Sequence, residues 1–238
     1  MKRSRIDAII DEFLAFAGRC GFHLPPWATF SPAQWAATGP EADEVRACQL
    51  GWDVTDFGSG QFERMGLTLF NIRNGQPSPT GGGLTAPFEF APGKDYCEKI
   101  MLVREGQVTP YHFHFSKMED IINRSGGVLS IKLCNATGEH ALDEKSEVSV
   151  QVDGFTRTFP PGGELLLSPG ESVTLPPYLY HQFQAVPGRG WALVGEVSRV
   201  NDDARDNRFL QPLPRFPAIE DDAPARYGLC TEYPQGAK

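Results

Sequence analysis

The first fifty residues carry apolar side chains at helical spacing. Gly21 is suited to end a first helix, and Ser31 followed by Pro32 is typical of a second helix start, with the serine as cap. A third short helix is predicted over 41–49. These helices are expected to cover one end or face of a sheet, because an apolar stripe needs a packing partner. The stripe of the first helix consists of Ile6, Ile9, Ile10, Phe13, Leu14 and Ala17.

From residue 65 onward the pattern changes to short apolar or alternating runs that are separated by turn residues, which is typical of β-strands. Asp153 followed by Gly154 is a strong hairpin signal, and a Gly/Pro-rich loop is predicted over 74–93. Many short strands favour a sandwich or barrel. The predicted strands are Gly66–Arg73, Cys97–Arg104, Val108–Phe115, Asp120–Asn123, Val128–Cys134, Val148–Val152, Phe155–Phe159, Glu164–Leu167, Ser172–Leu175, His181–Val186 and Trp191–Val200.

We therefore predict one mainly β domain in three parts. Residues 1–64 form a helical decoration, 65–211 the barrel, and 212–238 a Pro-rich segment that wraps the surface. A chain of 238 residues is long enough for one such domain.

Charge and cysteine usage narrow the function. The formal net charge of −8 disfavours nucleic acid and anionic membranes as partners, because both need a basic patch. Five cysteines without a CxxC pair indicate reduced thiols rather than a disulfide framework. We see no apolar run long enough for a signal peptide or a membrane span, and we expect a cytoplasmic protein.

Four residues form a candidate metal site. His112 and His114 alternate along a predicted strand, so both imidazoles point to one face. Glu119 follows a short turn later and can return its carboxylate to that face, and His181 begins another strand. Three imidazoles and one carboxylate leave positions open on a six-coordinate ion, which is typical of catalytic sites. The His-X-His pair by itself would also be compatible with histidines that are ordinary polar residues without a metal.

The spacing around these residues resembles the two cupin signatures, and the chain is identified as a member of that superfamily. Tyr178 and Ala185 depart from the second signature, at a glycine and an asparagine position. The resemblance implies a single cupin barrel, or jelly roll, with the N-terminal helices packed on it. The matching positions are Gly106, His112, His114, Glu119 and Gly126 in the first signature, and Gly170, Pro176 and His181 in the second.

Longer blocks resemble the D-lyxose isomerase family of cupins over almost the whole chain. They are LGWDVTDFGSG, EKIMLVREGQVTPYHFH, SKMEDIINR, SVTLPPYLYHQF and GEVSRVNDDARDNRF. The resemblance implies a metal-dependent aldose–ketose isomerase that interconverts D-lyxose and D-xylulose, and also D-mannose and D-fructose. It further implies Mn2+ as cofactor, with Co2+ or another divalent ion as a substitute, and a neutral monosaccharide as substrate.

Four further polar residues are candidates for work on the sugar. Glu196 lies in an otherwise apolar strand and is our candidate base, while Lys99, also in an apolar strand, could neutralise an enediolate oxygen. The alternatives are a structural carboxylate and a lysine that reaches solvent. Asp206 and Arg208 could bind the distal hydroxyl groups of the sugar, or lie on a solvated loop.

The same ligand set also serves cupin dioxygenases and decarboxylases, and a non-catalytic sugar-binding cupin is a third alternative. The polar candidates favour a polyol substrate. The outward aromatic residues Tyr111, Phe113 and Phe115 must be covered by the N-terminal helices or by a second subunit. We expect a homodimer.

Overall fold

A computed structural model describes residues 1–76 and 93–234. Most of the Gly/Pro-rich loop predicted over 74–93 lies outside these residues. The N-terminal part contains the helices α1 (Arg3–Arg19), α2 (Pro32–Ala36) and α3 (Asp43–Ala47), with short 3-10 turns at Pro26–Thr29 and Pro40–Ala42. The Ser31 hydroxyl caps α2 by accepting from the Gln34 amide, as the sequence predicted. No described helix is long and apolar enough to cross a membrane.

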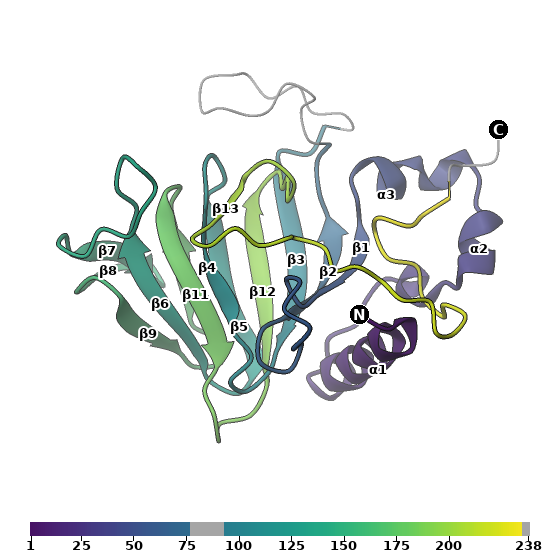
Figure 1. The fold of residues 1–238 in the computed structure, drawn as a ribbon, viewed down its shortest axis with the longest axis horizontal. Helices are drawn as coiled ribbons and strands as arrows, with labels where there is room; N and C mark the ends of the chain where they lie inside the picture. The colour runs from purple at the N-terminus through teal and green to yellow at the C-terminus, as the bar shows by residue number, and fades with distance from the viewer. Residues whose placement is uncertain (77–92, 235–238) are drawn as a thin grey trace.

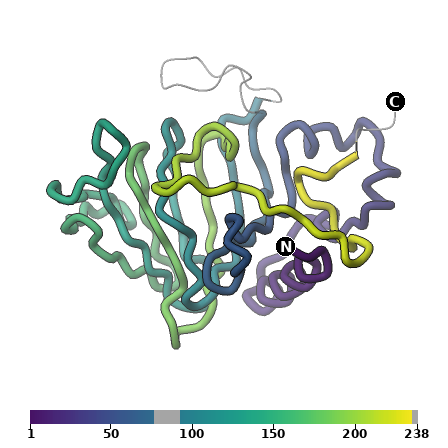
Figure 2. The backbone as a smooth tube through the Cα atoms, viewed as in Figure 1, coloured from purple at the N-terminus to yellow at the C-terminus, as the bar shows by residue number. Residues whose placement is uncertain are grey.

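The strands form two antiparallel sheets that face each other (Figures 1 and 2). The large sheet has the order β1-β2-β3-β12-β5-β10-β7-β8, and the small sheet has the order β13-β4-β11-β6-β9. This arrangement confirms the predicted mainly β, jelly-roll barrel. The strand bounds are β1 Gly51–Thr55, β2 Leu67–Arg73, β3 Tyr96–Val103, β4 Thr109–His114, β5 Glu119–Gly126, β6 Leu129–Asn135, β7 Val148–Val152, β8 Phe155–Phe159, β9 Gly163–Leu167, β10 Ser172–Leu175, β11 Leu179–Ala185, β12 Ala192–Arg199 and β13 Asn207–Phe209.

The predicted strands correspond to β2 through β12, and two strands were missed. β1 pairs with β2 in the large sheet although it lies in the range predicted as helical. β13 pairs with β4 at the edge of the small sheet. The turn between β7 and β8 has positive φ at both Asp153 (50°) and Gly154 (81°), as the hairpin signal requires.

Two apolar clusters hold the layers together. One fills the barrel between the sheets, with residues such as Leu69, Met101 and Ile131. The other lies between α1 and the outer face of the large sheet, where Phe13 meets Trp52 edge to face at 5.0 Å. Along β3 the residues therefore alternate between the barrel interior and the helix, as the pleat of a strand requires.

The helices do not cover the outward aromatic residues, because they pack on the other sheet. Phe113 is buried on the outer face of the small sheet by its neighbours Phe115, Tyr178 and Tyr180, and by His140 from the loop after β6. Of the two alternatives for this face, cover by the N-terminal helices is therefore excluded. Figure 1 shows the reason, since α1, α2 and α3 gather beside β1 and β2.

Candidate metal centre and cavity

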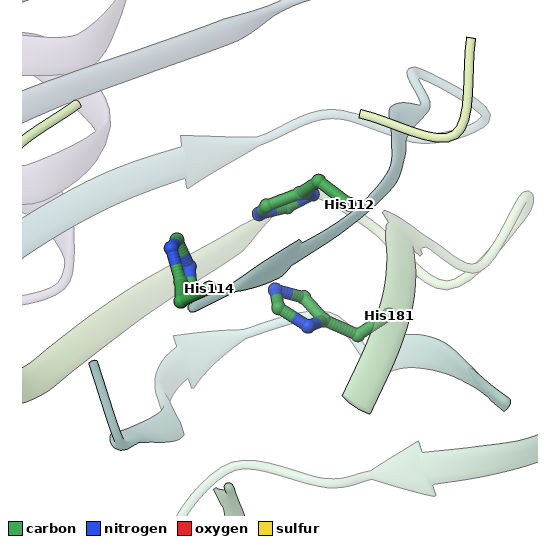
Figure 3. A group of neighbouring side chains, drawn as sticks. All are labelled: His112, His114 and His181. Atoms are coloured by element: carbon green, nitrogen blue, oxygen red, sulfur yellow. The ribbon is translucent and has the colours of Figure 1, made fainter. Parts of the chain in front are cut away.

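Three histidines meet inside the barrel on the small sheet (Figure 3). His112 and His114 point inward from β4, and His181 is the partner of His112 in the neighbouring strand β11. One ring nitrogen from each side chain lies within 4.8 Å of the others. The alternation of side chains along β4 places His112 and His114 on one face. The pairing of β4 with β11 adds His181, which lies nearly seventy positions after His112 in the sequence.

The backbone orients two of these rings. Nδ1 of His112 lies 2.8 Å from the Pro110 carbonyl oxygen, and Nδ1 of His181 lies 3.0 Å from the Leu179 carbonyl oxygen. A carbonyl only accepts, so Nδ1 carries the proton in each ring and Nε2 keeps its lone pair. Burial and the neighbouring histidines hold the pKa of His112 well below its ordinary value, which keeps that ring neutral. Neutral imidazoles fixed in this way are typical metal ligands.

Glu119 completes the centre from β5 in the opposite sheet. Its two carboxylate oxygens lie 3.1 Å from Nε2 of His181 and 3.3 Å from Nε2 of His114. Burial raises the pKa of the Glu119 carboxyl, but the charge of Lys117 and the hydrogen bond from His114 outweigh it and hold the pKa well below the usual range. Nε2 of His181 is buried and has no hydrogen-bond partner among the described residues. Several lone pairs therefore converge on one point, which is the arrangement that a divalent cation fits.

Lys117 links this centre to Glu196, and the sequence analysis missed it. Its Nζ lies 2.8 Å from Oε2 of Glu119 and donates to Oε1 of Glu196 at 2.7 Å. Burial lowers the pKa of Lys117, but the carboxylates of Glu119, Glu196 and Asp203 raise it well above the ordinary value. The side chain is 2% exposed, so it is a buried ammonium between two carboxylates. Lys117 lies in the turn between β4 and β5, where a sequence reading expects a solvated lysine.

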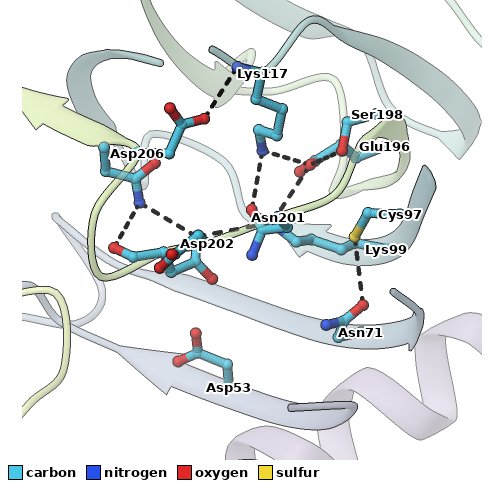
Figure 4. A network of polar contacts seen from close by, with 12 residues as sticks. Asp53, Asn71, Cys97, Lys99, Lys117, Glu196, Ser198, Asn201, Asp202 and Asp206 are labelled. Atoms are coloured by element: carbon cyan, nitrogen blue, oxygen red, sulfur yellow. Dashed lines mark hydrogen bonds and ion pairs between the residues drawn. The ribbon is translucent and has the colours of Figure 1, made fainter. Parts of the chain in front are cut away.

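Lys99 and Glu196 are brought together as direct cross-strand neighbours on β3 and β12. Nζ of Lys99 lies 3.3 Å from Oε1 of Glu196 and donates to Oδ1 of Asn201 at 2.8 Å (Figure 4). Ser198 also donates to Oε1 of Glu196, at 3.2 Å. Neither Lys99 nor Glu196 reaches solvent, with side chains 3% and 6% exposed. The snorkelling alternative for Lys99 is therefore excluded.

Three more charged groups extend the cluster. Asp203, in the segment after β12, lies 3.8 Å from Nζ of Lys99 and 3.4 Å from Nη2 of Arg215. Arg215 also donates to Asp53 of β1 at 2.5 Å. The C-terminal segment therefore contributes a side chain to the barrel interior. No sequence signal marks Arg215, because it follows a Pro-rich stretch without periodicity.

A cavity of about 430 Å3, counting the part open to solvent, joins these groups. The large sheet lines it with Lys99, Glu119 and Glu196, and apolar residues such as Phe57 and Phe183 complete the wall. Further lining residues are His112, His114, Lys117, Asp203, Asn207, Phe209 and Arg215.

Asp206 and Arg208 do not line this cavity. The Asp206 carboxylate accepts from the Ser116 amide and hydroxyl at 2.8 and 2.7 Å and from the Lys117 amide at 3.0 Å. It therefore holds the turn that carries Lys117. Arg208 is exposed and lies close to Tyr180 on the outer face of the small sheet. Because side chains alternate along β13, its neighbours Asn207 and Phe209 point inward in its place.

The model of the D-lyxose isomerase family matches residues 1–233 of this sequence. The chain belongs to the D-lyxose isomerase family. The expectation from the sequence blocks is confirmed, as is the expectation of an enzyme of the sugar-isomerase class.

Curated relatives cover nearly the full length of this chain. It is 50% identical over 237 residues to a D-lyxose/D-mannose isomerase of Escherichia coli O157:H7, with 99% of each chain covered. It is also 50% identical over 234 residues to a D-lyxose/D-mannose isomerase of Serratia proteamaculans, with 98% of each chain covered.

Solved structures of sugar isomerases share the fold. The L-ribose isomerase of Cellulomonas parahominis with L-ribose is 17% identical, with a TM-score of 0.57, over 92% of this chain and 98% of that one. The L-ribose isomerase of Geodermatophilus obscurus has a TM-score of 0.59 at 16% identity over the same shares. At this identity the likeness concerns the fold alone.

Proposed function

We propose that this chain is a metal-dependent aldose–ketose isomerase that interconverts D-lyxose and D-xylulose, and D-mannose and D-fructose. The names of the two relatives at 50% identity support these sugars. The observation that carries the proposal is the cavity in which a His/Glu centre adjoins a buried Lys117–Glu196 pair. Such a reaction needs both a cation site for two sugar oxygens and a base beside the carbon atoms.

The ion that we propose is Mn2+, held by His112, His114, His181 and Glu119. Imidazole and carboxylate donors suit manganese, and open positions on the ion suit the hard oxygens of a sugar. When bound, the ion supplies Lewis acidity at the carbonyl and hydroxyl oxygens of the substrate.

Glu196 acts as the base that moves the proton between C2 and C1. It faces the cavity, and among the described residues Lys117 and Ser198 donate to Oε1, while Nζ of Lys99 lies 3.3 Å from the same oxygen. Oε2 is therefore the atom available to receive a proton from carbon. Lys117 and Lys99 keep positive charge beside the reacting atoms, where negative charge develops on the sugar oxygens.

The substrate is a neutral sugar rather than a sugar phosphate. Lys99, Lys117 and Arg215 are the cations in the described cavity wall, and each has two carboxylate partners within 4.0 Å. A phosphate entering the cavity would have to compete with these carboxylates for every cation.

The test is conversion of D-lyxose and D-mannose by the purified protein loaded with manganese. A chelator should abolish conversion, and manganese or cobalt should restore it. His112→Ala, His114→Ala and His181→Ala should each lose bound manganese in elemental analysis together with nearly all activity. Full activity of metal-free protein, or faster conversion of the sugar phosphates, would contradict the proposal.

A further inference from the structure

Unpartnered polar atoms gather in the cavity. Eight buried side-chain nitrogen or oxygen atoms have no hydrogen-bond partner among the described residues, and five of them belong to the cavity wall or the histidine centre. Two are histidine nitrogens that the metal centre accounts for. The other three are Oγ1 of Thr109, Oδ1 of Asn207 and Nη1 of Arg215. A buried polar atom without a partner is costly, so these three atoms call for a ligand.

Asn207 and Arg215 are fixed by the same carboxylate. Nδ2 of Asn207 donates to Oδ1 of Asp203 at 3.2 Å, and Nη2 of Arg215 lies 3.4 Å from Oδ2 of Asp203. Holding one end of each planar group sets the direction of the other end. Asp203 thereby presents a free acceptor, Oδ1 of Asn207, and a free donor, Nη1 of Arg215, in the cavity wall.

These atoms lie beside the histidine centre. Asn207 is the register partner of His114 across β13 and β4, so the two side chains are adjacent on the inner face. Thr109 begins β4 and pairs with Phe183 of β11, another cavity residue. If the histidine centre binds one end of a small ligand, the rest of the ligand therefore lies next to Thr109, Asn207 and Arg215.

The chemistry of this wall matches a neutral polyol. A hydroxyl group both donates and accepts, so it can satisfy an amide oxygen, a guanidinium N–H or a threonine hydroxyl. A phosphate would accept only and would leave Oδ1 of Asn207 unsatisfied. We propose that the Thr109 hydroxyl and Oδ1 of Asn207 bind hydroxyl groups of the sugar on the carbons beyond C1 and C2. This inference rests on the proposed function.

Thr109→Val is the test, with Thr68→Val as matched control. Valine keeps the shape of threonine and removes the hydroxyl. Oγ1 of Thr68 is likewise buried without a partner, but Thr68 lies on β2 between the cavity residues Leu67 and Leu69 and so faces away. Both variants should melt at or above the wild-type temperature, because neither loses a hydrogen bond within the chain. Only Thr109→Val should lower kcat/KM for D-lyxose, by about 2- to 10-fold, the worth of one neutral hydrogen bond.

A second variant and a second readout complete the test. Asn207→Ala should lower kcat/KM by a similar factor, and the losses should multiply in Thr109→Val/Asn207→Ala if the two residues contact different hydroxyls. The affinity for D-arabinitol, the alditol made by reducing D-lyxose, should fall in parallel in calorimetry.

Equal kcat/KM and equal D-arabinitol affinity in Thr109→Val and wild type would overturn the inference while leaving the isomerase proposal intact. A wild type that converts neither D-lyxose nor D-mannose would overturn the isomerase proposal. In that case only the affinity for D-arabinitol would test the inference. The inference would be overturned if the wild type did not bind D-arabinitol, or if Thr109→Val bound it as tightly as the wild type.

Discussion

Replacing Lys117 by methionine should destabilise the metal-free protein strongly. The change keeps an unbranched side chain but removes an ammonium that lies 2.7 Å from one carboxylate and 2.8 Å from another. The buried carboxylates of Glu196 and Glu119 would then lose the ammonium group that lies between them. Removal of one partner from a buried ion pair costs about 3–5 kcal/mol. In a chain of this size about 1 kcal/mol shifts Tm by about 2–4 °C, so we expect Tm to fall by about 6–20 °C.

The assay is thermal unfolding at pH 7 in the presence of a chelator, because bound metal would raise Tm by mass action. Lys132→Met is the control, since Lys132 is exposed on β6 and its loss should change stability by no more than about 0.5 kcal/mol. Lys117→Met/Glu196→Gln removes the cation together with one of its carboxylates, and should melt above Lys117→Met. A Lys117→Met variant that melts with the Lys132→Met control would refute the charge argument, as would a double variant less stable than Lys117→Met.

Four further substitutions test the remaining assignments. Glu196→Gln should keep manganese and lower kcat by about 10²–10⁴-fold with little change in KM, and it should stop the release of deuterium from C2-labelled D-lyxose into water; unchanged turnover would remove Glu196 as the base. Asp206→Ala should lower Tm and kcat, because three hydrogen bonds that hold the Lys117 turn are lost, whereas Arg208→Ala should leave kcat/KM at the wild-type value. Burial raises the pKa of Asp203, but Lys99, Arg215 and Lys117 hold it well below its ordinary value, so its contribution to stability is complete above about pH 4 and is lost as the pH falls further. In urea unfolding, the stability gap between wild type and Asp203→Asn should therefore narrow from pH 7 to pH 3; a constant gap would contradict this pKa.

The sequence, read with its resemblance to the cupin signatures, pointed to three histidines that the structure brings together. The His-X-His alternation fixes two imidazoles on one face of β4, and a short turn returns Glu119 from β5, so neither depends on distant packing. Glu196 and Lys99 could also be found, because a charged residue inside an apolar strand must have a buried partner. The pattern did not show that they are each other's neighbours, which follows from the pairing of β3 with β12.

The alternation of inward and outward side chains could not be predicted for a strand as short as β13. β13 has three residues, and nothing in Asn207–Phe209 indicates which side chains point inward. Asp206 and Arg208 were therefore chosen for their charge, although the pairing of β13 with β4 places Asn207 and Phe209 in the cavity. β1 was missed although Trp52, Asp53, Val54 and Thr55 alternate between apolar and polar. A run of four alternating residues is at the lower limit of length for a strand pattern.

The sequence by itself determined the fold class and pointed to the three histidines that the structure brings together, because strand periodicity and the spacing that resembles the cupin signatures mark both. Only the tertiary structure decided that Lys117 is buried between Glu119 and Glu196, and that Asp53 and Arg215 belong to the same cluster. These side chains come from a turn, a short strand and an aperiodic segment, where the local sequence allows either solvent or the interior. Their burial depends in part on distant charge partners, since Lys117 and Glu196 are 79 positions apart and Asp53 and Arg215 are 162 positions apart.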